Sequence, residues 1–372
     1  MKVTIHKLFD YLLETTAEDP PECFIGFSLA RSPRLKDFLA DLDPDLSLDW
    51  NGKSFLGLPA LRQRVLDQAD LDLHLDSVLI TAGAAEANYL LFRQLLQAGD
   101  EIITESPGWP QAGVMAKAIG ANQVEVARDE ARGWWLDPEA VARAITPRTR
   151  MIFLTNPNNP TGRLIPKGDL RALADLADKH CIWLVVDEVY AGLEWAGPRP
   201  PSIAGITRFG ITTGSVSKAL GLQGLRTGWM ICQSPEVIHD AMILRENGSE
   251  IMNTLGEHIA EVALRPDRLA AALGQARAEG AATLDLLDRF VAQEPRLSWH
   301  RPEAGLIGLA RLAGSDGESL ARALLRPPWR TFLLPGSAYG LPHHIRIGAG
   351  GGPEARLNEG LERLASALRD LT

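Results

Sequence analysis

The sequence has few cysteines, no long apolar segment and no excess of basic residues. Its three cysteines, Cys23, Cys181 and Cys232, lie far apart. Such an odd, sparse set predicts free thiols in a reducing compartment rather than a disulfide framework. The longest apolar run, residues 181–186, is far shorter than a membrane span, and residues 1–20 lack the apolar core of a signal peptide. We therefore expect a soluble cytoplasmic protein with no membrane partner.

The charge and the length of the chain further restrict the classes of protein to which it could belong. Lys and Arg number 38 against 47 Asp and Glu, a net charge of −9, which argues against a nucleic-acid-binding surface. No cysteine pairs with a histidine at metal-ligand spacing, so no metal is expected. With 372 residues, 45% of them apolar, the chain can form a sizeable core and two or three domains. No segment repeats along the chain, which argues against a solenoid.

Short apolar segments alternate with helical patterns between residues 78 and 213. Strands are expected at 78–81, 101–104, 123–127, 151–154, 182–186 and 209–213, and helices at 84–96, 110–119 and 167–180. Apolar runs without polar alternation are typical of a sheet buried on both faces. Their alternation with helices predicts βαβ units and an α/β fold with a mostly parallel sheet.

The pattern changes after about residue 234. Long helices rich in Ala, Leu and Arg are expected at 236–243 and 255–290, followed by strands at 306–312 and 344–347 and a closing helix at 356–368. We therefore predict three parts. They are an N-terminal arm at 1–50 that joins the small domain, a large α/β domain at 51–260 and a small α+β domain at 261–372.

Polar residues follow several predicted strands, where ligands bind in a parallel sheet. The loop 155–162 contains Asn159, whose amide offers a donor and an acceptor, although the loop could equally be a rigid connection. Asp187 ends an apolar strand, with Tyr190 three residues on. A buried acid needs a cation nearby, unless Asp187 only caps the next helix.

Lys218 lies among small and apolar residues after the strand at 209–213. A desolvated lysine loses its proton easily and becomes a nucleophile suited to a Schiff base. The competing interpretation is a surface lysine whose stem covers apolar neighbours.

An anion site is indicated at the first strand–helix junction. Gly83, Ala84 and Ala85 open a helix there, and free N–H groups at a helix start attract phosphate. Arg226 would clamp the anion, or else form a surface salt bridge. Trp109, after the second strand, could stack on a ring or pack in the core. Together these are the parts that pyridoxal phosphate needs.

Three motifs carry a family resemblance. They are Asn-Pro-Thr-Gly at 159–162, Asp-x-x-Tyr at 187–190, and Ser-x-x-Lys at 215–218 followed by Arg226. With them, the sequence resembles the class I/II aminotransferases of fold type I from residue 50 to the C-terminus. Segments 57–62, 334–337 and 345–347 resemble other parts of the family. The resemblance implies a large domain with a mostly parallel central sheet flanked by helices, plus a smaller α+β domain.

The resemblance also implies roles around pyridoxal 5'-phosphate. Lys218 would form the internal aldimine and carry the substrate's α-proton, and Asp187 would keep the ring nitrogen protonated. Asn159 and Tyr190 would bind the phenolate oxygen, and Trp109 would stack on the ring.

The remaining groups would bind anions. Ser215, Arg226 and the 83–85 backbone would hold the phosphate, and Arg346 with Asn159 would bind the substrate's α-carboxylate. The implied reaction exchanges an amino group between an amino acid and a 2-oxo acid in a homodimer with shared active sites. A tyrosine that commonly precedes the 57–62 segment is missing, and Trp50, Asn51 or Lys53 could replace it.

Other functions compete with transamination. The same cofactor supports C–S lyases, decarboxylases and oxidases, of which a C–S lyase is the main alternative. A nucleotide-binding oxidoreductase would need G-x-G-x-x-G, which the glycines at 348–352 do not match. A regulator or scaffold without catalysis is disfavoured because Lys218, Asp187, Asn159, Tyr190 and Arg226 are all present.

Overall fold

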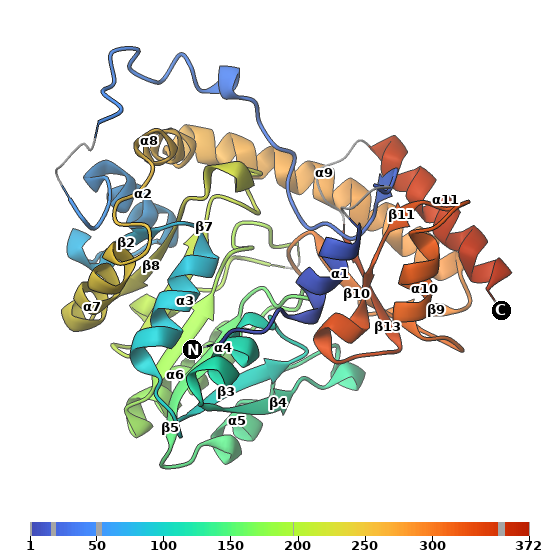
Figure 1. The fold of residues 1–372 in the computed structure, drawn as a ribbon, viewed down its shortest axis with the longest axis horizontal. Helices are drawn as coiled ribbons and strands as arrows, with labels where there is room; N and C mark the ends of the chain where they lie inside the picture. The colour runs from blue at the N-terminus through green and yellow to red at the C-terminus, as the bar shows by residue number, and fades with distance from the viewer. Residues whose placement is uncertain (1, 16–19, 50–53, 196, 349–353, 372) are drawn as a thin grey trace.

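A seven-stranded sheet forms the centre of the larger part of the molecule (Figure 1). The computed structural model describes residues 2–15, 20–49, 54–195, 197–348 and 354–371. The strand order is β2-β8-β7-β6-β5-β3-β4. Their bounds are β2 Val78–Thr81, β3 Glu101–Ser106, β4 Asn122–Ala127, β5 Thr149–Thr155, β6 Trp183–Asp187, β7 Gly210–Ser215 and β8 Gly228–Cys232. The neighbours among β3 to β7 are parallel, whereas β8 is antiparallel to both β2 and β7. The mostly parallel sheet is confirmed, but β8 was not predicted.

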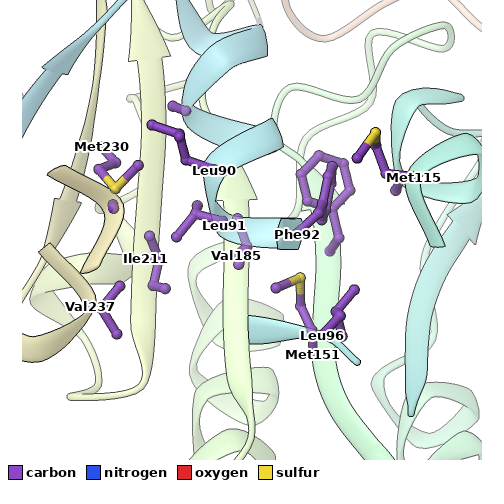
Figure 2. Packing of buried hydrophobic residues seen from close by; sticks show 14 of the residues in the cluster. Leu90, Leu91, Phe92, Leu96, Met115, Met151, Val185, Ile211, Met230 and Val237 are labelled. Atoms are coloured by element: carbon purple, nitrogen blue, oxygen red, sulfur yellow. The ribbon is translucent and has the colours of Figure 1, made fainter. Parts of the chain in front are cut away.

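Helices cover both faces of this sheet, as its continuous apolar strands require. They are α2 Pro59–Ala69, α3 Ala84–Leu95, α4 Gln111–Ile119, α5 Pro138–Ala144, α6 Lys167–His180 and α7 Pro235–Glu246. The helices predicted at 84–96, 110–119 and 167–180 correspond to α3, α4 and α6. On one face, Leu91 and Phe92 of α3 pack with Met151, Val185 and Ile211 of three adjacent strands (Figure 2). This close packing gives the ends of the central strands fixed positions.

The single helix predicted at 255–290 is wrong. The structure has two helices there, α8 Thr254–Ala263 and α9 Pro266–Gln293. Pro266 has no N–H to continue the first helix, and Arg265 before it is extended, with ψ 141°. The break lets α8 pack on α2 while α9 runs toward the second sheet.

A four-stranded antiparallel sheet, in the order β12-β13-β10-β9, forms the centre of the smaller part. Its strands are β9 Leu297–Trp299, β10 Ile307–Leu312, β12 Leu334–Pro335 and β13 His344–Gly348, with helices α10 Gly317–Leu324 and α11 Glu354–Asp370. β1 (Cys23–Phe24) pairs with β11 (Thr331–Phe332), so the N-terminal segment joins this part. The exact limits of the three predicted parts stay predictions.

The remaining elements are short or lie at the N-terminus. They are helix α1 Lys7–Thr15 and the 3₁₀ turns η1 Leu35–Asp37, η2 Leu75–Ser77, η3 Glu130–Arg132, η4 Ile203–Gly205, η5 Gln223–Leu225 and η6 Gly336–Tyr339. α1 packs against η6. Within the described ranges, none of the helices combines the length and the apolar character needed to cross a bilayer.

Candidate active site

The buried acid Asp187 is the last residue of β6, near the middle of the large sheet. Its Oδ2 accepts a hydrogen bond of 2.8 Å from Asn88 Nδ2, and its Oδ1 accepts one of 3.0 Å from the backbone N–H of Val189. Burial raises the pKa of Asp187 to about 6, against a smaller lowering by these hydrogen bonds and by the charge of Lys218. We expected a half-buried acid at this strand end, and the structure differs: Asp187 is almost fully buried, with the positive charge of Lys218 acting on it.

Lys218 and Tyr190 lie beside Asp187. Lys218 follows β7, the strand that pairs with β6, and its Nζ is 5.9 Å from the centre of the Tyr190 ring. The Lys218 side chain is half-buried, so it is less desolvated than its neighbours suggest. Tyr190 is buried, and its hydroxyl lies 2.7 Å from Ser28 Oγ. The structure thus brings an amine, a phenol and a carboxyl together at adjacent strand ends.

Strand β8 joins the two segments that were predicted to bind an anion. Gly228 pairs with Thr81 at the end of β2 and with Ser215 at the end of β7. Gly83, with φ +85°, caps α3, so this helix begins at Ala84 as predicted. Arg226, which is exposed, donates from Nη2 to Ala82 O at 3.0 Å, and a Cβ on Gly83 would lie 2.4 Å from this nitrogen. The start of α3, Ser215 and Arg226 therefore lie around the beginning of β8.

Asn159 and Arg346 lie in contact although they come from different sheets. Arg346, in β13, donates from Nη1 to Asn159 Oδ1 at 3.0 Å and to the Tyr339 hydroxyl at 2.8 Å, and from Nη2 to Gly26 O at 2.6 Å. Tyr339 also donates to Asn159 Oδ1 at 3.2 Å. The third nitrogen of Arg346, Nε, is buried and has no hydrogen-bond partner among the residues that the structure describes. This buried cation is suited to binding a carboxylate.

Trp109 lies at the edge of this group. Its ring is partly buried, Nε1 donates to Gln111 Oε1 at 3.2 Å, and His6 packs edge-on against it at 5.7 Å between ring centres. The candidates for the missing tyrosine, Trp50, Asn51 and Lys53, lie outside the described residues.

Sequence reasoning missed two buried polar side chains of the site, Asn88 and Tyr339. Asn88 interrupts an apolar stripe of α3 that includes Ala84, Ala87 and Leu91, and this polar residue in a buried position was the available signal. Tyr339 follows the 334–337 segment, and its sequence context gave no sign that it faces Arg346.

The arrangement as a whole suits a ligand with a basic ring nitrogen, an aldehyde and a phosphate. The buried Asp187 carboxyl would be stabilised by a cationic ring nitrogen, and Lys218 supplies an amine for the aldehyde. The glycine-dependent turn at Gly83 and the α3 N–H groups provide the anion site.

Comparisons with known proteins agree with this chemistry. The family described as aminotransferase class I and II matches residues 52–364. The chain is 30% identical to a probable aspartate/prephenate aminotransferase of Thermus aquaticus, over 84% of this chain and 82% of the relative. It is 31% identical to an arginine–pyruvate transaminase of Pseudomonas aeruginosa, over 85% and 81% of the two chains.

A solved structure gives the same result. A PLP-dependent aminotransferase from Streptococcus suis superposes with a TM-score of 0.90 and 25% identity, covering 100% of this chain and 99% of the other. Fold, family and cofactor therefore agree with the resemblance that the motifs carry. The chain belongs to the class I and II aminotransferases, and it is a pyridoxal-phosphate-dependent enzyme that transfers an amino group between an amino acid and a 2-oxo acid.

Proposed function

We propose that Lys218, Asp187 and Tyr190 carry the amino-transfer chemistry. The observation that supports this most strongly is the Lys218 amine beside the Tyr190 ring and the buried Asp187 carboxyl, at the ends of paired strands. When bound, pyridoxal phosphate supplies an aldehyde that links to an amine and a ring that withdraws electrons from the substrate's α-carbon.

Each residue acts on a particular atom. Lys218 Nζ is the amine that would hold the cofactor covalently, and as a free amine it would carry the proton taken from the substrate's α-carbon. Asp187 keeps the ring nitrogen protonated, because an anionic carboxylate favours a cation beside it. Tyr190 and Asn159 would donate hydrogen bonds to the ring oxygen, for which Asn159 has its amide N–H groups, because its oxygen already accepts from Arg346 and Tyr339. Trp109 would pack against the face of the cofactor ring.

The phosphate is held where β2 and β7 end on either side of β8. Ser215 Oγ, the Arg226 guanidinium and the backbone N–H groups of Gly83, Ala84 and Ala85 are the proposed ligands. The α3 dipole favours an anion at this end of the helix. Fixing the phosphate here sets the position of the rest of the cofactor relative to Lys218.

Arg346 is the proposed ligand of the substrate's α-carboxylate, together with Asn159. Support comes from the buried guanidinium and its unpaired Nε. An arginine offers two parallel N–H groups to a carboxylate, which fixes the orientation of the α-carbon as well as binding the acid. That orientation decides which bond stands perpendicular to the ring, and hence the reaction.

A homodimer is the proposed assembly, as the family resemblance implies. Apolar side chains are exposed along the N-terminal segment: Leu35, Leu39, Leu48 and Phe55. Figure 1 shows this segment running outside α8 and α9, where Asp41 pairs with Arg265 and Arg268. Light scattering coupled to size-exclusion chromatography tests the assembly.

We also propose a cytoplasmic, reducing location, since the exposed Cys181 and the buried Cys23 and Cys232 are free thiols.

Two measurements test this function. Borohydride reduction followed by peptide mass spectrometry should place the cofactor on Lys218, and a cofactor mass on another lysine would overturn the assignment. The holoenzyme is then mixed with single amino acids without a 2-oxo acid, including aspartate and arginine, on which the named relatives act. Transamination converts the cofactor to its amine form and releases one equivalent of 2-oxo acid. Release of ammonia together with a thiol would instead identify a C–S lyase.

A further inference from the structure

The side chain of Asn88 connects α3 to the acid at the centre of the site. Asn88 is fully buried, and its Nδ2 donates to Asp187 Oδ2 at 2.8 Å. Its other end is also occupied, because Asn88 Oδ1 accepts a hydrogen bond of 2.8 Å from Thr213 Oγ1. Thr213 lies in β7, directly opposite Asp187 in the pairing of β6 with β7. A chain of two hydrogen bonds therefore runs from Thr213 through Asn88 to Asp187.

The order of donors in this chain fixes the orientation of the Asn88 amide. An asparagine could turn its oxygen or its NH₂ group toward a carboxylate, but only the NH₂ group can donate to it. The Thr213 hydroxyl accordingly donates to the oxygen at the other end. Gln111 Oε1, which accepts from Trp109 Nε1, lies 3.5 Å from the same Asn88 nitrogen. Hydrogen bonds at both ends of the side chain therefore hold the Asn88 amide in this orientation.

We infer that Asn88, oriented by Thr213, is a positioning residue that keeps the Asp187 carboxylate ionised and directed at the cofactor's ring nitrogen. The inference rests on the role proposed above for Asp187. Hydrogen bonds to a carboxylate favour its charged form. Asp187 Oδ1 accepts a hydrogen bond from the Val189 N–H, and Asn88 donates the hydrogen bond that the other oxygen, Oδ2, accepts. Of the groups that counteract the rise of the Asp187 pKa on burial, Asn88 contributes most.

Loss of Asn88 has a definite consequence for the cofactor. A proton shared between a ring nitrogen and a carboxylate moves toward the carboxylate when that group loses a donor. The ring nitrogen is then less often protonated, and the cofactor withdraws electrons less strongly. A buried polar side chain that served packing alone would leave this proton where it is.

The experiment measures ring-nitrogen protonation directly. Holoenzyme is prepared with ¹⁵N-labelled pyridoxal phosphate, and its ring-nitrogen resonance is recorded by solid-state NMR. Asn88→Leu removes the donor to Asp187 at similar side-chain volume. Thr213→Val removes only the hydroxyl that orients the Asn88 amide. If Asn88→Leu does not fold, Thr213→Val alone tests the inference. Thr213→Ser keeps the hydroxyl. The matched control is Thr207→Val, just before the same strand, whose buried hydroxyl donates to the Asp178 carboxylate instead.

In Asn88→Leu the resonance should move toward the unprotonated position, and kcat should fall roughly 10- to 100-fold with little change in KM. Thr213→Val should change the resonance and kcat in the same direction by less, whereas Thr213→Ser and Thr207→Val should match the wild type. Wild-type resonances in both Asn88→Leu and Thr213→Val would overturn the inference. Asp187→Asn separates the two proposals, because an unmoved resonance in that variant would refute the role of Asp187 itself.

Discussion

Arg346 and Asn159 share a hydrogen bond of 3.0 Å although 187 residues separate them in the chain. The bond joins β13 of the small sheet to the loop that follows β5 of the large sheet. A substrate carboxylate bound by Arg346, as proposed, would therefore lie where the small sheet meets this loop, and its binding would depend on how the two are placed relative to each other.

Replacing Arg346 by lysine should weaken substrate binding. The ammonium keeps the charge but loses the paired N–H groups, so kcat/KM for the amino acid should fall roughly 10- to 100-fold, mainly through KM. Steady-state kinetics with donor and acceptor varied separately checks this. An unchanged KM for both substrates would show that another cation binds the carboxylate.

Replacing Tyr339 by phenylalanine should give a milder defect of the same kind. The change removes the hydroxyl that accepts from Arg346 Nη1 at 2.8 Å and donates to Asn159 Oδ1 at 3.2 Å. We expect a several-fold rise in KM, because Arg346 and Asn159 each lose a hydrogen-bond partner while the aromatic packing stays intact. A change in kcat alone would place Tyr339 closer to the chemical step than to the carboxylate.

Lys218→Ala should lose turnover but keep the cofactor. Removal of the amine removes the proton-moving group, which is worth roughly 10²- to 10⁴-fold in rate. The phosphate ligands remain, so dialysed protein should still bind pyridoxal phosphate without a covalent link. Absorbance spectra before and after borohydride report that link. Lys167→Ala, at the exposed start of α6, is the control and should behave as the wild type.

Asp187 should make the apoenzyme less stable as the pH rises. Its pKa goes from 3.8 to about 6 on folding, so the folded chain binds the proton more tightly. Stability from this group is complete below the unfolded pKa and is lost as the pH rises through the folded pKa. Compared with Asp187→Asn, the wild-type apoenzyme should lose about 2 kcal/mol more between about pH 4.5 and about pH 7.5. Urea unfolding measures this, and an equal loss in both proteins would contradict it.

Gly228→Ala should disturb the phosphate site. A Cβ there would lie 2.5 Å from the carbonyl carbon of Gly83, 2.6 Å from the N of Ala84 and 2.7 Å from Gly214 O. These contacts are backbone, so the strands must move apart, at a cost of about 1–3 kcal/mol in folding and a weaker affinity for pyridoxal phosphate. Gly224→Ala, whose Cβ would meet nothing within 4 Å, is the matched control. Fluorescence titration of the apoenzyme with the cofactor compares the two.

The alternation of strands and helices in the large sheet could be predicted, and so could the residues at the strand ends. Apolar runs and the loops that flank them are local features of the sequence. Asp187 and Lys218 follow this rule, since each ends or follows such a run. The antiparallel β8 could not be predicted in the same way, because its place between β2 and β7 depends on pairing distant in sequence. Asn88 and Tyr339 were missed for a related reason. Their hydrogen-bond partners Asp187 and Asn159 lie 99 and 180 positions away in the chain and become neighbours only when α3 and η6 are packed.

The position of β8 also ties cofactor affinity to folding. The two halves of the proposed phosphate site, at Gly83 and Ser215, are far apart in the chain and become neighbours only when β8 has paired with both β2 and β7. An unfolded or partly paired chain lacks this proposed phosphate site, so it should bind pyridoxal phosphate much more weakly than the finished sheet. By mass action, saturating cofactor at about 100 times its Kd adds about 3 kcal/mol to stability. The availability of the cofactor would thus set how much of this chain stays folded in the cell, as well as how much of it is active.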